Sequence, residues 1–311
     1  MRKPVISVVV VSDYGSSASK TWDDERRCLA ALAAQDIGEP FEVLLLESSR
    51  FRNNVPPDVA GIVPRARVVF SDAETSYGLK NAGAREASAH LVAILDADCS
   101  ASPDWLRHCV AVFRKRPEVS VVSGRTHYEG SGLLERVLCL LSRSYQDPGR
   151  EGETGFASNN ATGFRRDAYL ASPLPENLGP FSARIQSEAI RRAGGVLWFE
   201  PKMRVVHEFE GVAMEMDIRR NIGYGTVATR LAESWMPYAS LIRRGVSAIP
   251  LIYAGKLFNA WGDCIRCAKY YGVRPYELPV ALVSALVVQA MEVPGMFAAY
   301  RGRSVGPTAY R

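Results

Sequence analysis

Runs of apolar residues alternate with amphipathic stretches over the first two thirds of the chain. Residues 5–11, 42–47 and 91–96 are near-continuous apolar runs, and residues 68–70 form a shorter one. Runs of this kind are typical of central parallel strands that are buried on both faces. The segments between them have helical spacing, as in the Ala-rich stretch 78–89. The pattern therefore predicts a doubly wound, mostly parallel α/β sheet.

The same alternation continues further along the chain. It predicts helices at 105–113 and 183–193 and strands at 119–122, 157–166, 196–199 and 204–207. Residues 129–155 interrupt the pattern, because glycines and prolines surround one helical piece at 133–145. Long loops near a site are often lids or acceptor-binding elements, and we expect that role here.

Polar residues follow the predicted strands where ligands of open α/β sheets bind. Ser12 and Asp13 follow the first strand, Glu47 ends the second, and Asp96 and Asp98 end the strand at 91–96. Two carboxylates this close suit a hard divalent cation such as Mg²⁺ or Mn²⁺, above all one that also carries substrate phosphates. The alternative is that Asp98 caps the next helix and Asp96 is a solvated strand end.

The composition is that of an ordinary globular protein. Hydrophobic residues make up 47% and charged residues 23% of the 311 residues, which argues against disorder. The formal net charge is +5, and residues 211–311 alone hold 12 Lys/Arg against 6 Asp/Glu. A basic, apolar C-terminal region fits an anionic membrane surface or an anionic acceptor. No aromatic-plus-basic motif of the known nucleic-acid modules is present, so no nucleic-acid partner is expected.

The cysteines and the first residues indicate a cytoplasmic protein. All six cysteines lie scattered in apolar contexts, which suggests reduced thiols. The lone Cys264-x-x-Cys267 motif has no second pair, so we interpret it as two helix residues rather than a zinc or redox site. Met1-Arg2-Lys3-Pro4 leads directly into a strand and lacks a signal-peptide cleavage site.

Beyond residue 211 the pattern is helical throughout. Residues 236–261 and 278–300 are rich in apolar side chains, but residues 278–290 are too short a clean run to span a bilayer. A hairpin that is re-entrant or lies on a membrane surface, flanked by basic residues, is the expectation. The alternatives are a hairpin packed on the catalytic domain or against a second subunit, as in a homodimer.

The order of these elements resembles the family 2 glycosyltransferases, inverting enzymes with the nucleotide-sugar-binding GT-A fold. The resemblance covers residues 4–210, and several short motifs in the right order carry it. The motifs are Arg27-Cys28-Leu29 with Ala34-Gln35-Asp36, Phe41-Glu42-Val43, Lys80-Asn81-Ala82-Gly83, Leu95-Asp96-Ala97-Asp98, Asn159-Asn160-Ala161 with Phe164-Arg165-Arg166, and Pro201 with Val206-His207. The resemblance implies a catalytic domain at 1–210, followed by the helical region 211–311.

The resemblance also implies a donor site. Asp98, with Asp96 beside it, would hold the Mn²⁺ or Mg²⁺ ion that bridges the diphosphate of a nucleotide-sugar donor. His207 matches a position that often supplies a third metal ligand, although a lone histidine is more often a packed or surface residue. Glu47 stands where the family usually has an Asp that binds the nucleoside, and Ser48-Ser49 replaces the usual Asp-Gly-Ser.

Three further donor-site expectations depart more from the family pattern. Lys80 stands where Arg is common, so a diphosphate contact would lose the bidentate fork of Arg. Asn81, its neighbour, is either a donor-site residue or structural. Ser12 and Asp13 lie in the first nucleotide-facing loop, where only the location carries over.

The catalytic base is the least certain element of the site. An inverting transfer needs a carboxylate that takes the proton from the acceptor hydroxyl. Related sequences supply it from a Glu-Asp pair, but counting back from Gly194 places Ser182-Ala183 there. Glu188 is the nearest acid on that helix and is our first candidate, with Glu176 as the second.

We therefore expect a metal-dependent glycosyltransferase that uses a UDP-, GDP- or dTDP-sugar. Its acceptor would be a glycan, a lipid-linked sugar or another surface polysaccharide, and its place would be the cytoplasm or the inner face of the plasma membrane. The missing Glu-Asp pair keeps a second hypothesis open, a nucleotide-sugar-binding or scaffold protein without transfer. A nucleotidyltransferase is disfavoured, because no Gly-rich, Lys-containing loop follows the first strand.

Overall fold

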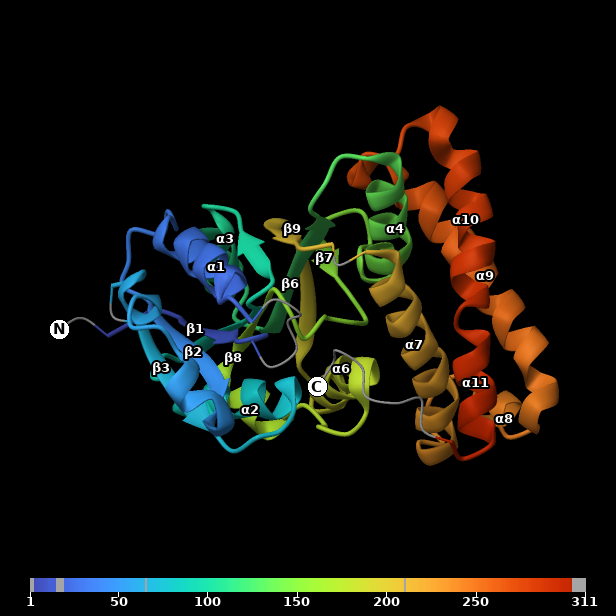
Figure 1. Cartoon of the computed structure of the whole chain (residues 1–311), viewed down its shortest axis with the longest axis horizontal. Helices are drawn as coiled ribbons and strands as arrows, with labels where there is room; N and C mark the ends of the chain where they lie inside the picture. Colours follow the sequence, from blue (N-terminus) through green and yellow to red (C-terminus); the bar gives the residue numbers. More distant parts are fainter. Residues whose placement is uncertain (1–2, 15–19, 65, 210, 304–311) are drawn as a thin grey trace.

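The computed structural model describes residues 3–14, 20–64, 66–209 and 211–303. A nine-stranded sheet forms one side of the molecule and a layer of helices the other (Figure 1). The strands are β1 (Ser7–Val11), β2 (Glu42–Ser48), β3 (Ala66–Ser71), β4 (Leu91–Asp96), β5 (Cys99–Ala101), β6 (Val119–Tyr128), β7 (Gly152–Glu153), β8 (Thr162–Arg165) and β9 (Val196–His207). The helices are α1 (Asp23–Ala33), α2 (Ser76–Glu86), α3 (Trp105–Lys115), α4 (Leu133–Arg143), α5 (Arg166–Ala171), α6 (Ser182–Arg192), α7 (Val212–Ala232), α8 (Ala239–Ile242), α9 (Ile249–Cys267), α10 (Leu278–Ala290) and α11 (Val293–Tyr300).

The strands follow the order β3-β2-β1-β4-β8-β6-β9-β5, and β7 pairs with β9 at one margin. The longer ladders, β3-β2-β1-β4 and β6-β9, are parallel, whereas the shorter ones involving β5, β7 and β8 are antiparallel. In the parallel block, Val11 is paired with Leu46 on one side and Asp96 on the other. The residues after β1, β2 and β4 therefore meet at one edge of the sheet.

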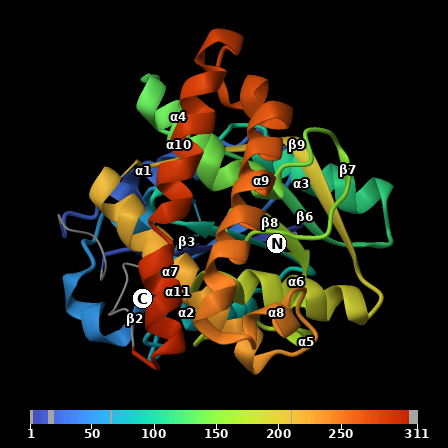
Figure 2. The same ribbon diagram turned by 90° about the vertical axis from the view of Figure 1, so that its right-hand side faces the viewer.

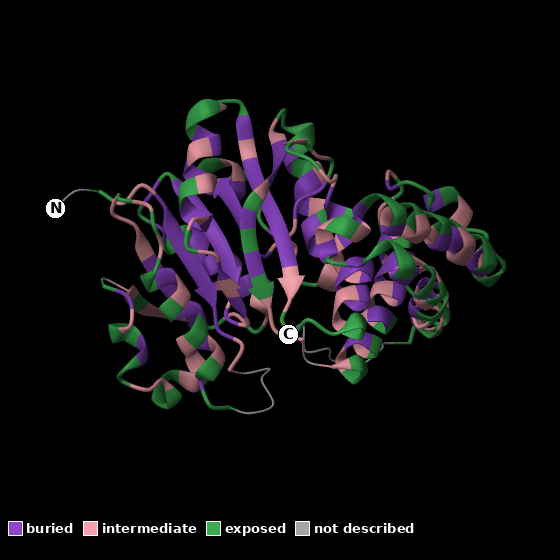
Figure 3. Cartoon of the chain, turned by 90° about the horizontal axis from the view of Figure 1, so that it is seen from above, coloured by how far each residue is buried: buried purple, intermediate pink, exposed green. Residues whose placement is uncertain are grey.

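Helices cover both faces of the parallel block, which explains why its strands are apolar on both sides. α1 and α3 pack with one face of the strands in one core cluster, and α2, α5 and α6 pack with the other face in a second. Figure 3 shows strands of this block as buried along most of their length, and these are β1, β2 and β4, whereas β3 at the margin is half-buried. The predicted α/β fold with a helical C-terminal region is confirmed.

Three elements differ from the sequence-based prediction. The two strands expected at 196–199 and 204–207 are one strand, β9, which continues through Pro201. It does so because it runs beside β6, which extends to Tyr128. At the irregular register between these strands, a Cβ on Gly124 would lie 2.1 Å from the Met203 carbonyl oxygen, so only glycine fits. β5, which the pattern did not predict, pairs antiparallel with the end of β9.

The helical side of the molecule contains more than the C-terminal third. α4 buries Val137–Leu141 against α9 and α10, so a helix from the interrupted segment belongs to this layer (Figure 1). α7 and α11 cross so closely that a Cβ on Gly295 would lie 1.8 Å from the Arg220 carbonyl oxygen. By length and composition alone, the continuous helix Pro275–Tyr300 could cross a membrane, and 39% of its most apolar window is buried.

Candidate active site

The edge at which β1, β2 and β4 end opens into a cavity of about 220 Å³. Seven of the residues predicted for the donor site line it. They are Ser12, Asp13, Glu47, Lys80, Asp96, Asp98 and His207. The remaining three, Asn81, Glu176 and Glu188, do not line it. The structure therefore brings together side chains that lie almost 200 residues apart in the chain.

Asp98 and His207 face each other across the junction of β5 and β9. The Asp98 Oδ2–His207 Nε2 distance is 3.2 Å, and the two residues are brought together because Cys99 pairs with His207 in the antiparallel ladder. With the Cys99 thiol, they form a group of metal-ligand atoms within 4.8 Å of one another. This group lies at the carboxyl end of β4, where a ligand is expected.

The hydrogen bonds of the His207 ring indicate what belongs between these two groups. Its Nδ1 lies 2.6 Å from the Glu208 carbonyl oxygen, which can only accept, so Nδ1 carries a proton. In the neutral ring Nε2 then carries a lone pair, and this lone pair faces the Asp98 Oδ2 atom. Two acceptors in contact require a shared cation, which is either a proton on the ring or a metal ion. Imidazole nitrogen and carboxylate oxygen form a donor set that fits Mn²⁺.

Cys99 is a poor ligand for such an ion. Burial raises the pKa of its thiol well above the ordinary value, and the nearby Asp98 and Asp96 carboxylates raise it further. The Sγ atom donates to Asp98 Oδ1 at 3.3 Å and accepts from Asn160 Nδ2 at 3.2 Å. Mn²⁺ prefers oxygen and nitrogen to sulfur ligands, so Asp98 and His207 are the candidate ligands of this group.

Asp96, which we predicted as a metal ligand, is held by Lys80 instead. The Lys80 Nζ–Asp96 Oδ1 distance is 2.8 Å, and the Lys80 side chain is almost fully buried. Asp96 is outside the group of clustered ligand atoms. Burial raises the pKa of Asp96 and the Lys80 ammonium lowers it, while Asp98 raises it. The pair places one cation of the chain at the carboxylate two residues before Asp98.

Asn160, which sequence reasoning used only as a motif residue, positions the end of β4. Its Oδ1 accepts from the Asp96 backbone N–H at 2.9 Å, while its Nδ2 donates to Cys99. One amide thus binds both sides of the Asp96–Asp98 turn.

A chain of hydrogen bonds joins the ends of β1 and β2. The Ser12 hydroxyl lies 2.7 Å from both Glu25 Oε1 and Glu47 Oε2. Glu25 also accepts from the Asp13 and Tyr14 backbone N–H groups, which shapes the loop after β1. Glu25 was not predicted, because its role depends on the close approach of α1 to that loop.

Two carboxyl groups in this part of the cavity have raised pKa values. Burial raises the pKa of Glu47, while hydrogen bonds from Ser12 and Ser48 lower it. Burial, with the Glu25 and Asp98 charges, raises the pKa of Asp13 to about 9. A neutral carboxyl can donate as well as accept, which suits recognition of hydroxyl groups.

Asn81 and Glu176 form a structural contact. The Asn81 side chain donates to the Leu174 carbonyl oxygen and to Glu176 Oε1, and its own oxygen accepts from the Tyr169 hydroxyl and the Leu174 N–H. Every polar atom of this buried amide is therefore bound within the protein. Of the two roles considered for Asn81, these contacts favour the structural one.

Glu188 does not line the cavity. Its carboxylate binds Arg191 and Arg192, three and four residues further along α6, at 2.9 Å each. The residues at the expected position of the base are Ser182 and Ala183, and Ala183 lines the cavity. The prediction of Glu188 as a base is therefore not supported by its placement, and neither is that of Glu176.

The opposite wall of the cavity comes from the helical layer, and sequence reasoning missed it. Arg143 at the end of α4 and Tyr145 just after it line the cavity together with Met214 and Ile218 of α7. These residues lie in the interrupted segment and at the start of the helical region. No motif marks them, because their position depends on how α4 and α7 pack.

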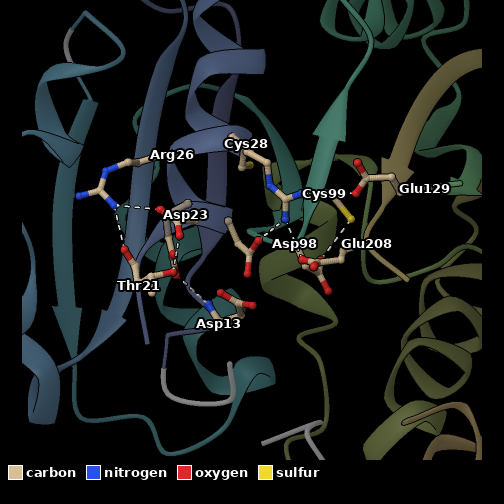
Figure 4. A network of polar contacts seen from close by, with 12 residues as sticks. Asp13, Thr21, Asp23, Arg26, Cys28, Asp98, Cys99, Glu129 and Glu208 are labelled. Atoms are coloured by element: carbon tan, nitrogen blue, oxygen red, sulfur yellow. Dashed lines mark hydrogen bonds and ion pairs between the residues drawn. The ribbon is translucent and has the colours of Figure 1, made fainter. Parts of the chain in front are cut away.

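A network of polar contacts lies beside the Asp98 turn, and Figure 4 shows Glu129 and Glu208 near Asp98 and Cys99. Arg27 of α1 binds Asp24, Glu129 and Glu208, the last at 2.7 Å. The Glu208 backbone N–H donates to the Asp98 carbonyl oxygen at 2.9 Å. The network ties α1 and the ends of β6 and β9 to the Asp98 turn.

We predict that His207→Ala weakens metal binding and leaves the fold intact. Removal of one of two protein ligands should raise the Mn²⁺ concentration for half-maximal binding at least tenfold, measured by calorimetry. His108→Ala is the matched control, because His108 binds only the Asp104 carboxylate on α3. Equal Mn²⁺ affinity in the His207 and His108 variants would exclude His207 as a ligand.

The comparisons with known proteins agree with this geometry. Residues 19–171 match the family model described as "Glycosyl transferase family 2". No curated protein sequence matches the chain significantly. The fold is similar to that of the mannosyltransferase PcManGT from Pyrobaculum calidifontis, solved with GDP-Man and Mn²⁺ (TM-score 0.57, 14% identity, 98% of this chain and 89% of that chain).

It is also similar to GalNAc-T7, solved with UDP, GalNAc and Mn²⁺ (TM-score 0.52, 16% identity, 76% of this chain and 52% of that chain). At these identities the likeness shows a shared fold, and the expected GT-A architecture is confirmed.

Proposed function

Residues 19–171 belong to glycosyl transferase family 2, and on this premise we propose that the chain is a metal-dependent, inverting enzyme that uses a nucleotide-sugar donor. The observation that carries the proposal is the pair of acceptors formed by Asp98 and His207, 3.2 Å apart at the carboxyl end of β4. A divalent cation bound there would neutralise the charge that develops on the departing diphosphate.

The residues around this pair fit the parts of a nucleotide diphosphate. Glu47 and Ser12 lie at the ends of β2 and β1, where a carboxyl group can bind ribose or base. Lys80 places a buried ammonium at Asp96, beside the site for the diphosphate. The two similar structures contain GDP-Man and UDP with Mn²⁺, which supports a UDP- or GDP-sugar as the donor, with dTDP-sugars as further candidates.

The acceptor would enter between the sheet and the helical layer. We propose a hydroxyl of a glycan or of a lipid-linked sugar, bound against the wall that Arg143, Tyr145 and Met214 provide. The cytoplasmic side of the plasma membrane is the proposed location, supported by the six cysteines, which are all free and buried.

The proton of an attacking hydroxyl requires a base, and Glu188 is badly placed for this. Among the described residues, the acids that line the cavity are Asp13, Glu47, Glu74, Asp96 and Asp98. We propose that the base comes from the cavity wall rather than from α6.

Glu188→Gln therefore tests this placement. Because its carboxylate only binds two exposed arginines of its own helix, transfer should stay within about twofold of the wild type, and the melting temperature should fall slightly. Initial rates measured with the active donor check this. A hundredfold loss of rate with an unchanged melting temperature would restore Glu188 as the base.

A second function, binding of nucleotide-sugar without transfer, is favoured by one observation. Ser182 and Ala183 occupy the place at which related sequences have an acidic pair. A panel of UDP-, GDP- and dTDP-sugars with Mn²⁺, assayed by release of the nucleoside diphosphate, separates the two. Turnover of at least one donor supports the enzyme, whereas tight metal-dependent diphosphate binding with no turnover of any donor supports the binding protein.

A further inference from the structure

α9 and α10 form the outermost layer of the helical side and lie next to each other (Figure 2). Two side-chain hydrogen bonds join them along their length. The Trp261 indole N–H donates to the Leu282 carbonyl oxygen at 2.9 Å, and the Tyr253 hydroxyl donates to the Leu286 carbonyl oxygen at 3.1 Å. These bonds fix the two helices as an antiparallel pair with one common outer surface.

Large apolar side chains are concentrated on this pair. α9 exposes Leu251, Phe258 and Ile265, which are spaced seven residues apart and so lie along one side of the helix. α10 exposes Val280, Val283 and Val287, spaced three and four apart. Together these six residues form what we call the outer face. Phe258 is 66% and Val283 61% exposed, which is high for such side chains in a helix.

The concentration is specific to this part of the molecule. Of the nineteen exposed large apolar side chains among the described residues, ten lie between Val246 and Phe297. Contiguous exposed apolar surface of this kind marks an interaction site, whereas single exposed apolar residues do not.

The charged side chains exposed on residues 239–303, the stretch that contains the outer face, are all of one sign. The exposed ones between residues 239 and 303 are Arg243, Arg244, Arg266, Lys269, Arg274, Arg301 and Arg303. The same described stretch has no exposed carboxylate, because its three acids are covered and paired. Asp263 binds Arg266, Glu277 binds Arg136, and Glu292 binds Arg219 and Lys256.

These charges decide between the two occupants that an apolar face could have. In a symmetric dimer through the outer face, the same surface patch would meet itself, which would bring two basic stretches together with no exposed carboxylate of residues 239–303 to pair with them. An anionic bilayer instead complements them, since its headgroups attract basic residues and its acyl boundary accepts the apolar side chains.

The ion pairs of Glu292 indicate a helix that lies on the surface rather than one that spans. Glu292 is buried between α10 and α11, where its carboxylate binds Lys256 of α9 at 2.5 Å and Arg219 of α7 at 3.4 Å. The C-terminal half of the helix Pro275–Tyr300 is thereby held against the rest of the protein. Insertion across a bilayer would break this network and expose charges to the hydrocarbon.

We propose that the outer face of α9 and α10 docks the protein peripherally on an anionic lipid bilayer. Its apolar side chains enter the interface and its basic rim contacts the headgroups. Docking depends on this surface alone and needs neither donor nor metal, so it can be tested independently of the catalytic proposal.

The test is flotation of the full-length protein with vesicles of phosphatidylcholine, with or without 30% phosphatidylglycerol. Wild-type protein should bind the anionic vesicles and lose binding as NaCl is raised, because salt screens the basic rim. The double variant Phe258→Gln/Val283→Gln should bind at least tenfold more weakly, since two exposed side chains no longer enter the interface.

The matched control is Leu170→Gln/Leu231→Gln, which changes two exposed leucines on α5 and α7 outside the outer face. It should bind the vesicles as the wild type does. Absence of wild-type binding to anionic vesicles, or equal binding by the two double variants, would overturn the proposal. So would a dimer, seen in analytical ultracentrifugation, that dissociates on Phe258→Gln/Val283→Gln substitution while vesicle binding is unchanged.

Discussion

Replacing Asp98 with alanine is expected to lower kcat/KM for sugar transfer by at least about a thousandfold. The variant loses the carboxylate that faces His207 Nε2 at 3.2 Å, and with it the site for a cation at the leaving diphosphate. Mn²⁺ should then no longer strengthen the binding of a nucleoside diphosphate. Initial rates and calorimetric titrations with and without Mn²⁺ measure the two effects.

Asp104→Ala provides the control for Asp98→Ala. Asp104 is an aspartate that follows β5 and does not line the cavity, and its carboxylate binds Ser102 and two side chains of α3, Arg107 and His108. Its substitution should leave the Mn²⁺ dependence unchanged. If Asp98→Ala retained metal-dependent transfer, the assignment of the metal to the β5–β9 junction would be wrong.

Replacing Arg219 with alanine is expected to have the largest effect on stability. Arg219 is buried in α7, where it binds Glu215 at 2.7 Å, Glu292 at 3.4 Å and the Ser142 hydroxyl at 2.6 Å. Its loss leaves two buried carboxylates with fewer partners, which typically costs about 3–5 kcal/mol of the free energy of unfolding. Urea unfolding followed by circular dichroism measures the loss.

The neighbouring Arg220→Ala is the matched control, since Arg220 is exposed. It should change the free energy of unfolding by less than about 0.5 kcal/mol. Equal, small losses in both variants would show that the buried network does not hold α7 and α11 together. The result also bears on the cavity, because Ile218 and Met214 of α7 form part of its wall.

The same network implies a pH dependence. Burial alone would raise the pKa of Glu215, but Arg219 and Ser142 bring it below its ordinary value of 4.5. A carboxyl with a lowered folded-state pKa contributes stability above the unfolded value, and this contribution is lost as pH falls through the folded value. Wild-type stability should therefore decline below pH 4.5, and Arg219→Ala should show less of this decline.

Much of the donor half of the site was predictable from the chain. Apolar runs that end in Ser12, Glu47 and Asp96 place these residues at the carboxyl ends of neighbouring parallel strands. That inference depends on the apolar pattern of the strands, which can be read locally, and on the general rule that ligands of such sheets bind at the carboxyl ends of the strands. The position of Lys80 followed from a motif just before β4.

The rest of the site depends on packing that has no local signature. His207 reaches Asp98 only because β9 continues through Pro201 and pairs with β5, a strand of three residues. Glu188 was chosen by counting along one helix, but its orientation is decided by Arg191 and Arg192 on the same helix. Arg143 enters the cavity because α4 packs in the helical layer, far from its neighbours in sequence.

Calorimetric titration of GDP and UDP into the wild-type protein, with Mn²⁺ and with EDTA, tests the central claim most directly. We predict that at least one diphosphate binds, and that Mn²⁺ strengthens its binding at least tenfold, because the cation joins the diphosphate to Asp98 and His207. Equal affinity in Mn²⁺ and EDTA, or no binding of either diphosphate, would contradict a metal-dependent nucleotide-sugar site at this edge of the sheet.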